Sequence, residues 1–192
     1  MNLTAIVGSV TPPGRLLSGT KWLIDDARES RTDLNTQLIN LGDKRVAFAD
    51  GRPPEQYNDD TASIIRSVVD ADAVVLATPV YRGSYTGALK NLLDHLPIEA
   101  LGSKPVAIVA MGATNHHFLG ADWHLRDVLA WFGALVLPTS VYLSSADFVD
   151  GQLSDGAKQD LRALASAAIA LTVANPGNGN FIGPRPLAAR RS

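Results

Sequence analysis

The segment that decides the fold covers residues 73–94 and reads AVVLATPVYRGSYTGALKNLLD. It opens with a continuously apolar run, which is typical of a strand buried on both faces of a sheet. Pro79 fixes its own backbone conformation and favours an extended residue before it, and the two glycines that follow let the backbone approach another molecule closely. The segment therefore predicts a buried strand that ends in a rigid loop, which faces a flat or bulky ligand and leads into a helix. An ordinary strand-to-helix connection, with a helix start near Ser84 or Thr86, is the alternative on local sequence.

Strand-like and helix-like segments alternate along the rest of the chain. Apolar runs predict strands at residues 3–7, 35–41, 73–77, 106–111 and 134–143, and periodic segments predict helices at about 16–28, 60–69, up to 95, 118–132 and 154–174. This alternation requires a parallel sheet with helices on both faces. The predicted fold class is α/β: a doubly wound five-stranded parallel sheet with the flavodoxin-like strand order 2-1-3-4-5.

The composition is that of one globular unit. The 192 residues have an apolar fraction of 46% and a formal net charge of -2, and neither number indicates a nucleic-acid partner. The absence of cysteine excludes disulfides, thiolate catalysis and cysteine-ligated metal centres, so any redox chemistry must belong to a bound cofactor. We expect a single domain over residues 1–174 and an irregular tail over residues 175–192.

The chain carries no signal for a membrane. No apolar run approaches the roughly 20 residues that a membrane span needs. The first residues lead at once into a strand rather than into a signal sequence, and the arginines of the tail are too few to indicate a membrane or RNA tag. We therefore expect a cytoplasmic protein with no membrane or nucleic-acid partner.

Two loops are expected to meet where the sheet reverses its winding, which is where doubly wound sheets bind ligands. The first strand ends at Gly8 and the third ends near Thr78. The first loop, GSVTPPGRLLS over residues 8–18, places hydroxyls and a guanidinium at a helix start, an arrangement that favours a phosphate. It is neither a Walker loop nor a dinucleotide-binding G-x-G-x-x-G loop. The alternative is a proline-rich turn in which Ser9 or Ser18 only caps the helix.

A third loop, MGATN over residues 111–115, follows the fourth strand. Its small residues would let the backbone reach a ring system that lies across the strand ends, and the next helix start would stabilise negative charge there. A simple glycine turn with Thr114 or Asn115 as the helix cap fits the local sequence about equally well.

Residues 78–94 resemble the signature of the NADPH-dependent FMN reductases, a flavodoxin-like family, nearly residue for residue. Within this family the chain is most similar to the FMN reductases of two-component alkanesulfonate monooxygenase systems. The resemblance runs through roughly residues 3 to 145. Its central motifs are TPVY, SYTGALK and LLD.

The two other loops resemble the family with small departures. The first loop of the family usually reads Gly-Ser-x-Arg followed by serines, and this chain matches it at residues 8–9, at Arg15 and at Ser18. Thr11 stands in place of the first arginine, which leaves Arg15 as the only arginine of the loop. The third loop of the family is commonly of the Gly-Gly-Thr type and corresponds here to residues 112–114.

The resemblance implies an NAD(P)H:FMN oxidoreductase. FMN would bind with its phosphate at the first loop and its ring between the two other loops, and NAD(P)H would pass hydride to the flavin, so that no side chain is catalytic. The cofactor-binding residues implied are Ser9, Arg15, Leu16, Ser18, Thr78, Pro79, Val80, Tyr81, Arg82, Ser84, Gly112, Ala113 and Thr114. Reduced FMN would be supplied to a partner flavin-dependent monooxygenase.

Two other functions remain open. The first is an FMN-containing reductase of quinones, azo dyes or metal ions, and the second is a flavodoxin-like electron carrier without nicotinamide chemistry. Electron carriers usually dock through acidic faces, and a balance of 17 basic and 19 acidic side chains gives no acidic surplus. The composition therefore favours the enzyme.

Histidines and tryptophans complete the predicted features. His117 and His124 lie about 10.5 Å apart along a helix, and His116 points away from His117, so we expect no metal site. The helix at residues 118–132 is apolar on more than one face, and in the family the corresponding helix makes homo-oligomer contacts, so we expect a dimer or tetramer. Trp123 either packs on the sheet or contacts a second copy.

Overall fold

The computed structural model describes residues 1–12, 14–115, 118–175, 181–186 and 190. Its strands and helices, in chain order, are β1 (Asn2–Val7), α1 (Arg15–Ser30), β2 (Asn35–Asn40), α2 (Thr61–Val69), β3 (Ala73–Pro79), α3 (Gly87–His95), β4 (Pro105–Met111), α4 (Phe118–Trp131), β5 (Leu135–Val136), β6 (Val141–Leu143), β7 (Phe148–Val149), β8 (Gln152–Leu153) and α5 (Asp155–Ala174). Short 3-10 turns at Leu41–Asp43, Pro54–Gln56, Ile98–Leu101 and Ser145–Asp147 lie between them. None of the described helices is both long and apolar enough to cross a membrane.

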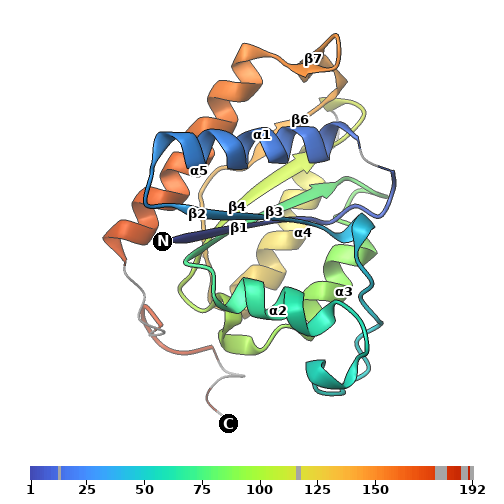
Figure 1. Ribbon diagram of the computed structural model, residues 1–192, viewed down its shortest axis with the longest axis vertical. Helices are drawn as coiled ribbons and strands as arrows, with labels where there is room; N and C mark the ends of the chain where they lie inside the picture. The colour runs from blue at the N-terminus through green and yellow to red at the C-terminus, as the bar shows by residue number, and fades with distance from the viewer. Residues whose placement is uncertain (13, 116–117, 176–180, 187–189, 191–192) are drawn as a thin grey trace.

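The main sheet is parallel and has the order β2-β1-β3-β4-β5, with β6 also paired to β4 (Figure 1). Helices α1 and α5 cover one face of it, and α2, α3 and α4 cover the other. The predicted flavodoxin-like α/β fold is thereby confirmed. All strands of the main sheet point the same way, so their carboxyl ends lie along one edge, where the loops from β1, β3 and β4 emerge (Figure 1).

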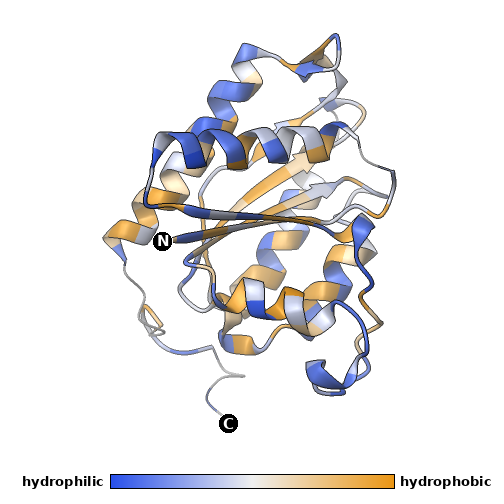
Figure 2. Ribbon diagram, viewed as in Figure 1, coloured by the Kyte–Doolittle hydropathy of each residue, from blue (hydrophilic) through white to orange (hydrophobic). Residues whose placement is uncertain are grey.

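Strand β3 shows how the sequence builds both halves of the core. Ala73, Val75 and Ala77 point towards α1 and α5, whereas Val74 and Leu76 point towards α2, α3 and α4. All five side chains are at most 2% exposed. Figure 2 shows the resulting band of apolar strands between helices that turn polar residues outwards. A strand that is buried on both faces must be apolar at every position, which is what residues 73–77 display.

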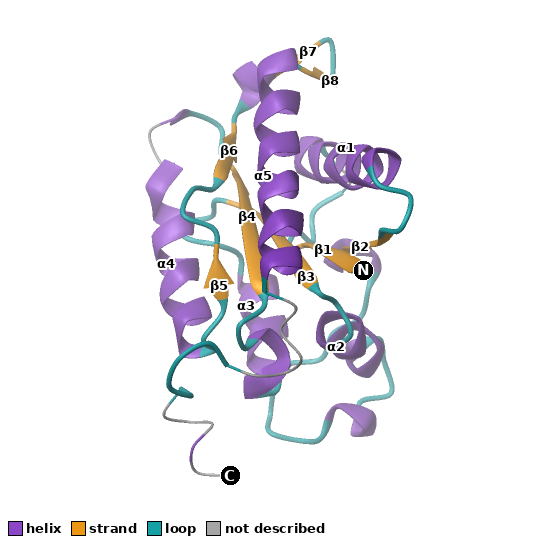
Figure 3. Cartoon of the chain, turned by 90° about the vertical axis from the view of Figure 1, so that its left-hand side faces the viewer, coloured by secondary structure: helices purple, strands orange, loops and turns teal. Residues whose placement is uncertain are grey.

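The predicted fifth strand at residues 134–143 is wrong as one continuous strand. It forms two short strands, β5 and β6, that pair in turn with the two ends of β4 (Figure 3). Residues 137–140 lie opposite residues 107–108 of β4, so the chain bulges out of the sheet between β5 and β6. Pro138 has no N–H to donate to a ladder, and the guanidinium of Arg126 in α4 binds the carbonyl oxygens of Leu137 at 2.8 Å and Pro138 at 3.2 Å.

The described part of the tail comes after α5 and belongs to none of the strands and helices given above. It lies against the amino edge of the sheet. The Phe181 ring covers Gly102 and Gly133, where a Cβ atom on either glycine would crowd it. The N–H of Ile182 donates to the Ser103 hydroxyl at 2.6 Å. The tail is therefore anchored by specific contacts at the end of the sheet that is remote from the carboxyl-edge loops.

Candidate functional site

The loops after β1, β3 and β4 start side by side. The N–H of Gly8 donates to the carbonyl oxygen of Ala77 at 2.7 Å, and the N–H of Val80 donates to that of Met111 at 2.8 Å. These bonds continue the sheet ladder beyond the ends of β1 and β3. The parallel topology thus brings together the three loops that the sequence indicated as a site.

The loop after β1 encloses a cavity of about 160 Å³ at the amino end of α1. Ser9, Thr11, Arg15 and Leu16 line it, together with Pro79 of the loop after β3. Such a volume is below the roughly 300–1,000 Å³ of a whole small-molecule site, so it would enclose one end of a ligand. The cavity joins three predicted residues of the first loop to one of the second.

The amino end of α1 is suited to an anion. Its N-cap residue, Gly14, makes no side-chain hydrogen bond to the first turn, and no acidic residue lies in that turn. The N–H groups of a first helical turn lack helical partners, and the helix dipole places partial positive charge there. The Ser9 and Thr11 hydroxyls, 2.8 Å apart, add further donors beside it. The cavity therefore offers a phosphate both donors and positive potential.

Arg15 and Ser18 take different places at this helix end. The Arg15 guanidinium donates to the Ser145 hydroxyl at 2.9 Å and lies 5.7 Å from the Phe148 ring centroid, so the segment after β6 holds it beside the cavity. Ser18 is exposed, one turn into α1, and its hydroxyl donates to the carbonyl oxygen of Gly14 at 3.3 Å. Ser18 lines a neighbouring cavity next to Phe148 rather than the cavity at the amino end of α1.

The loop after β3 is a tight turn across residues 81–84. Tyr81 and Ser84 exchange two backbone hydrogen bonds of 2.8 and 3.1 Å, and the residues between them, Arg82 and Gly83, have φ angles of 53° and 76°. Positive φ at both central positions defines a type I′ turn, and glycine accepts this conformation without strain. Tyr81 is 46% exposed, so the turn projects from the sheet edge with its side chains available to a ligand.

Two threonines fix this loop from below. The buried Thr78 hydroxyl accepts the N–H of Thr86 at 3.2 Å. Thr78 therefore supports the loop from the protein interior and is not exposed at its surface. The Thr86 hydroxyl donates to the carbonyl oxygen of Gly8 and accepts the N–H of Leu89, which caps α3. The sequence indicated Thr86 only as a possible helix start, because its bond to Gly8 joins residues far apart in the chain.

Helix α4 supports the same turn from the side. Gly120 lies so close to the carbonyl oxygen of Gly83 that a Cβ atom at residue 120 would overlap it. His124 places Nδ1 at 2.9 Å from the Ser84 hydroxyl. His124 therefore contacts the turn, whereas His116 and His117 lie outside the described residues. Trp123 on the same helix is 64% exposed and does not pack on the sheet.

The loop after β4 is held by a tyrosine that the sequence analysis missed. The N–H of Gly112 donates to the carbonyl oxygen of Leu143 at 3.0 Å, and the Tyr142 hydroxyl donates to that of Thr114 at 2.7 Å. Partial burial raises the pKa of the Tyr142 phenol. A tyrosine between two apolar strand residues looks like any core aromatic, so no local signal reveals this contact. Ala113 is exposed at the tip of the loop.

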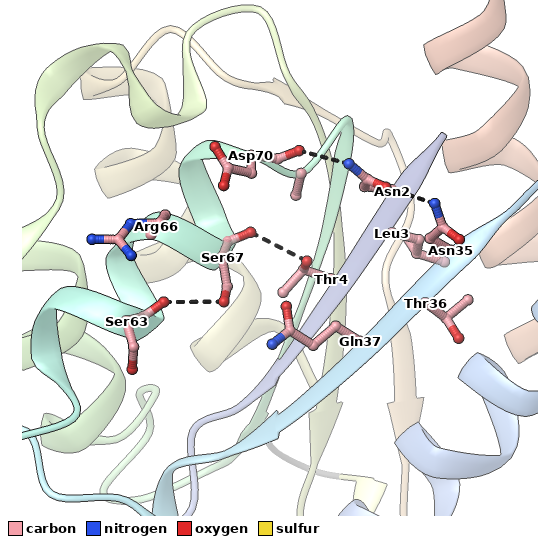
Figure 4. A pocket seen from close by; sticks show the side chains of 11 residues that line it. Asn2, Leu3, Thr4, Asn35, Thr36, Gln37, Ser63, Arg66, Ser67 and Asp70 are labelled. Atoms are coloured by element: carbon pink, nitrogen blue, oxygen red, sulfur yellow. Dashed lines mark hydrogen bonds between the residues drawn. The ribbon is translucent and has the colours of Figure 1, made fainter.

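A second cavity, of about 260 Å³, lies at the opposite edge of the sheet between β2 and α2 (Figure 4). Its polar side chains bond to nearby main chain: the Thr4 hydroxyl to the carbonyl oxygen of Ser67 at 3.3 Å, and the Asn2 amide to that of Asp70 at 3.1 Å. Within the described chain, no site residue predicted from the sequence lines it. The carboxyl edge, which joins three loops, is the better candidate site.

Comparisons with known proteins identify the family of the chain. A sequence model of the NADPH-dependent FMN reductase family matches residues 1–148. The chain is 36% identical over 148 residues to an NAD(P)H-dependent FAD/FMN reductase of Geobacillus thermodenitrificans (strain NG80-2). The aligned region covers 77% of this chain and 80% of the relative. The chain is also 32% identical over 172 residues to the NADH-dependent FMN reductase SfnF of Pseudomonas fluorescens (strain Pf0-1). That alignment covers 89% of this chain and 91% of the relative.

The fold is also similar to that of a solved structure. An NADH:FMN oxidoreductase (EMOB) in its apo form superposes with a TM-score of 0.78 at 24% identity, over 100% of this chain and 99% of the other. At this identity the likeness concerns the fold. The family match and the two relatives decide the assignment: the protein belongs to the NADPH-dependent FMN reductase family and is an oxidoreductase that uses NAD(P)H and FMN.

Proposed function

We propose that this protein binds FMN at the carboxyl edge of its sheet, reduces it with NAD(P)H and delivers the reduced flavin to a partner monooxygenase. The observation that carries the site assignment is the cavity beside the amino end of α1. It combines uncapped helix N–H groups, two hydroxyls and a nearby guanidinium, which is the donor set that a phosphate monoester requires.

The residues of the three loops fit FMN in distinct ways. Ser9, Thr11 and Arg15 would hold the phosphate. The turn at residues 81–84 and the loop at residues 112–114 would border the ring and offer it main-chain donors. When bound, FMN supplies the two-electron chemistry that accepts hydride from a nicotinamide. The protein supplies orientation, because the loops are fixed by Thr86, His124 and Tyr142 before any ligand arrives.

The proposal extends to association between copies. On α4, Trp123 and Trp131 are 64% and 53% exposed, and Phe118 is 51% exposed. Large apolar side chains gathered on one helix are typical of an interface. We propose that α4 forms the contact of a dimer or tetramer, which sedimentation velocity of wild type and Trp131→Glu tests. A wild type that remains monomeric would contradict this part.

The activity is tested by following NAD(P)H absorbance with purified protein. Oxidation is expected only when FMN is added, and NADH and NADPH are compared side by side because the relatives' names include both. Absence of flavin-dependent oxidation with either nucleotide overturns the proposal. Retained FMN after gel filtration identifies a fixed cofactor, whereas Michaelis kinetics in FMN with no retained flavin identify a released product.

The binding site is tested by substitution. Ser9→Ala and Arg15→Met should each raise the FMN concentration needed for half-maximal activity, by about ten- to a hundredfold for Arg15 because a charge-assisted bond contributes about 1.5–3 kcal/mol. Ser63→Ala and Arg66→Met are matched controls, since both residues line the cavity at the opposite edge. The delivery of reduced flavin is tested by coupling to a flavin-dependent monooxygenase. Quinone, azo and ferric acceptors are run in parallel, and a faster turnover with one of them favours that acceptor instead.

A further inference from the structure

Tyr142 occupies a position on β6 that directs its ring along the end of β4. Its neighbours Val141 and Leu143 are buried in the core beneath α1 and α5, so Tyr142 points to the opposite face of the sheet. It pairs in register with Ala110 of β4. Ala110 and Gly112 share that face and have a methyl group and no side chain, which leaves room for the ring to lie over them.

The Tyr142 hydroxyl is fitted closely to the loop after β4. It donates to the carbonyl oxygen of Thr114 at 2.7 Å. A Cβ atom on Gly112 would overlap the same hydroxyl oxygen. The N–H of Gly112 is bound to Leu143, so both ends of the loop at residues 112–114 are tied to β6. The path of this loop is therefore set by a strand that contributes no residue to the predicted site.

We propose that Tyr142 is a positioning residue for the flavin: its hydroxyl holds the main chain of residues 112–114 in the conformation that borders the FMN ring. This inference rests on the proposed function, because the loop has a ligand to position only if FMN binds there. Tyr142 acts through the loop and requires no contact with the cofactor.

The contact is better suited to positioning than to general stability. The bond between the Tyr142 hydroxyl and Thr114 lies at the surface, so water can replace it at the carbonyl oxygen when the hydroxyl is removed. In Tyr142→Phe the ring, whose end lies close to Gly112, should keep its place. Loss of the hydroxyl should therefore free the loop while leaving the free energy of unfolding almost unchanged.

The test compares FMN binding by wild type and Tyr142→Phe, followed through the flavin fluorescence. Removal of one neutral hydrogen bond should weaken binding by about three- to tenfold. The KM for FMN should rise by a similar factor, with kcat at saturating FMN and the thermal midpoint of the flavin-free protein unchanged. Tyr57→Phe is the matched control, because the Tyr57 hydroxyl bonds Asp50 in a loop away from the site.

A second pair of variants separates positioning from simple loss of a bond. Gly112→Ala forces the hydroxyl and the loop apart and should weaken FMN binding more than Tyr142→Phe does. In the double variant Gly112→Ala/Tyr142→Phe the overlapping hydroxyl is gone, so part of the affinity lost in Gly112→Ala should return.

The outcomes separate the inference from the function beneath it. A wild type that binds no FMN overturns both. A wild type that binds FMN, with Tyr142→Phe binding it equally well, overturns the positioning role alone. A Tyr142→Phe variant whose thermal midpoint falls together with its affinity also overturns it, since the hydroxyl would then act through global stability.

Discussion

The hydroxyl of Thr86 donates a hydrogen bond to the carbonyl oxygen of Gly8 and thereby joins the loop after β3 to the loop after β1. The Thr86 hydroxyl oxygen also accepts the N–H of Leu89 at 3.1 Å and thereby caps α3. Thr86 is only 3% exposed, so water cannot easily take over either bond. One buried hydroxyl thus fixes two loops at the carboxyl edge of the sheet and a helix end together.

Thr86→Ala should therefore destabilise the protein by about 2–3 kcal/mol, since it removes an N-cap and leaves a buried carbonyl oxygen unpaired. Urea denaturation measures this loss. Thr86→Ser keeps the hydroxyl and should retain most of the stability. The Ser154 hydroxyl caps α5 by accepting the N–H of Ala157 at 3.2 Å. Ser154→Ala removes only this cap and should lower the free energy of unfolding by only about 1 kcal/mol. Equal losses for Thr86→Ala and Ser154→Ala would contradict the bridging role.

Gly120→Ala tests the packing of α4 on the turn at residues 81–84. The added methyl group would overlap the carbonyl oxygen of Gly83, so α4 or the turn must move, and we expect a loss of about 1–3 kcal/mol in the free energy of unfolding. Gly156→Ala in α5 is the matched control, because nothing lies within 4 Å of its added Cβ atom. It should stabilise the protein by up to about 1 kcal/mol. Thermal unfolding shifts in opposite directions are the expected result.

Arg126→Met tests the ion pair that supports the bulge between β5 and β6. Asp122 is 6% exposed, and its carboxylate lies 2.8 Å from Arg126 Nε. Without Arg126 a buried carboxylate would lose its charge partner, which typically costs about 3–5 kcal/mol. Arg28→Met removes the partner of Asp25 at the surface, where both side chains are more than one-third exposed, and should cost less than about 1 kcal/mol. Similar losses of stability in both variants would contradict a larger contribution from the buried ion pair.

Lys104 predicts a pH dependence of stability. Burial lowers the pKa of its ammonium group to about 8, although the charges of Asp72 and Asp70 act in the opposite direction. The folded-state pKa lies below the ordinary value of 10.5, so between these values the unfolded chain binds more protons than the folded one. Stability should therefore rise as the pH increases through this window. Below about pH 8 both states are protonated, and the full penalty for burying the charge is present.

The measurement compares wild type with Lys104→Met from pH 7 to pH 10.5, so that titrations shared by both proteins cancel. The free energy of unfolding of wild type relative to the variant should increase by about 2–3 kcal/mol across the window. A difference that does not vary with pH would contradict a lowered pKa of Lys104.

The parallel sheet could be predicted because its cause is local. Residues 73–77 are apolar at every position, and alternating helical segments then leave a parallel sheet as the way to bury such strands. The split between β5 and β6 was missed although Pro138 marks it, because the apolar residues on both sides read as one strand. The guanidinium of Arg126 in α4 also stabilises the break, because it binds two carbonyl oxygens of the bulge, and this contact is distant in sequence.

Which of the predicted residues lie together could be predicted to the extent that these residues follow strand ends. Ser9, Arg15 and Pro79 come together because their strands are neighbours in a parallel sheet. The family resemblance grouped Ser18 with them, whereas the helical turn carries its side chain to another cavity. The Tyr142 contact joins two strand ends through one hydroxyl, and such pairings depend on the register between strands rather than on either sequence.

The bulge at residues 137–140 also governs which surfaces of this protein can recruit another chain. A straight outer strand presents a row of free N–H and C=O groups that can template a further strand and lead to aggregation. Here the outer strand is broken after Val136, and the Arg126 guanidinium binds the carbonyl oxygens of the two residues that follow. The break leaves only the two short strands β5 and β6 along this flank, which disfavours growth by strand addition there.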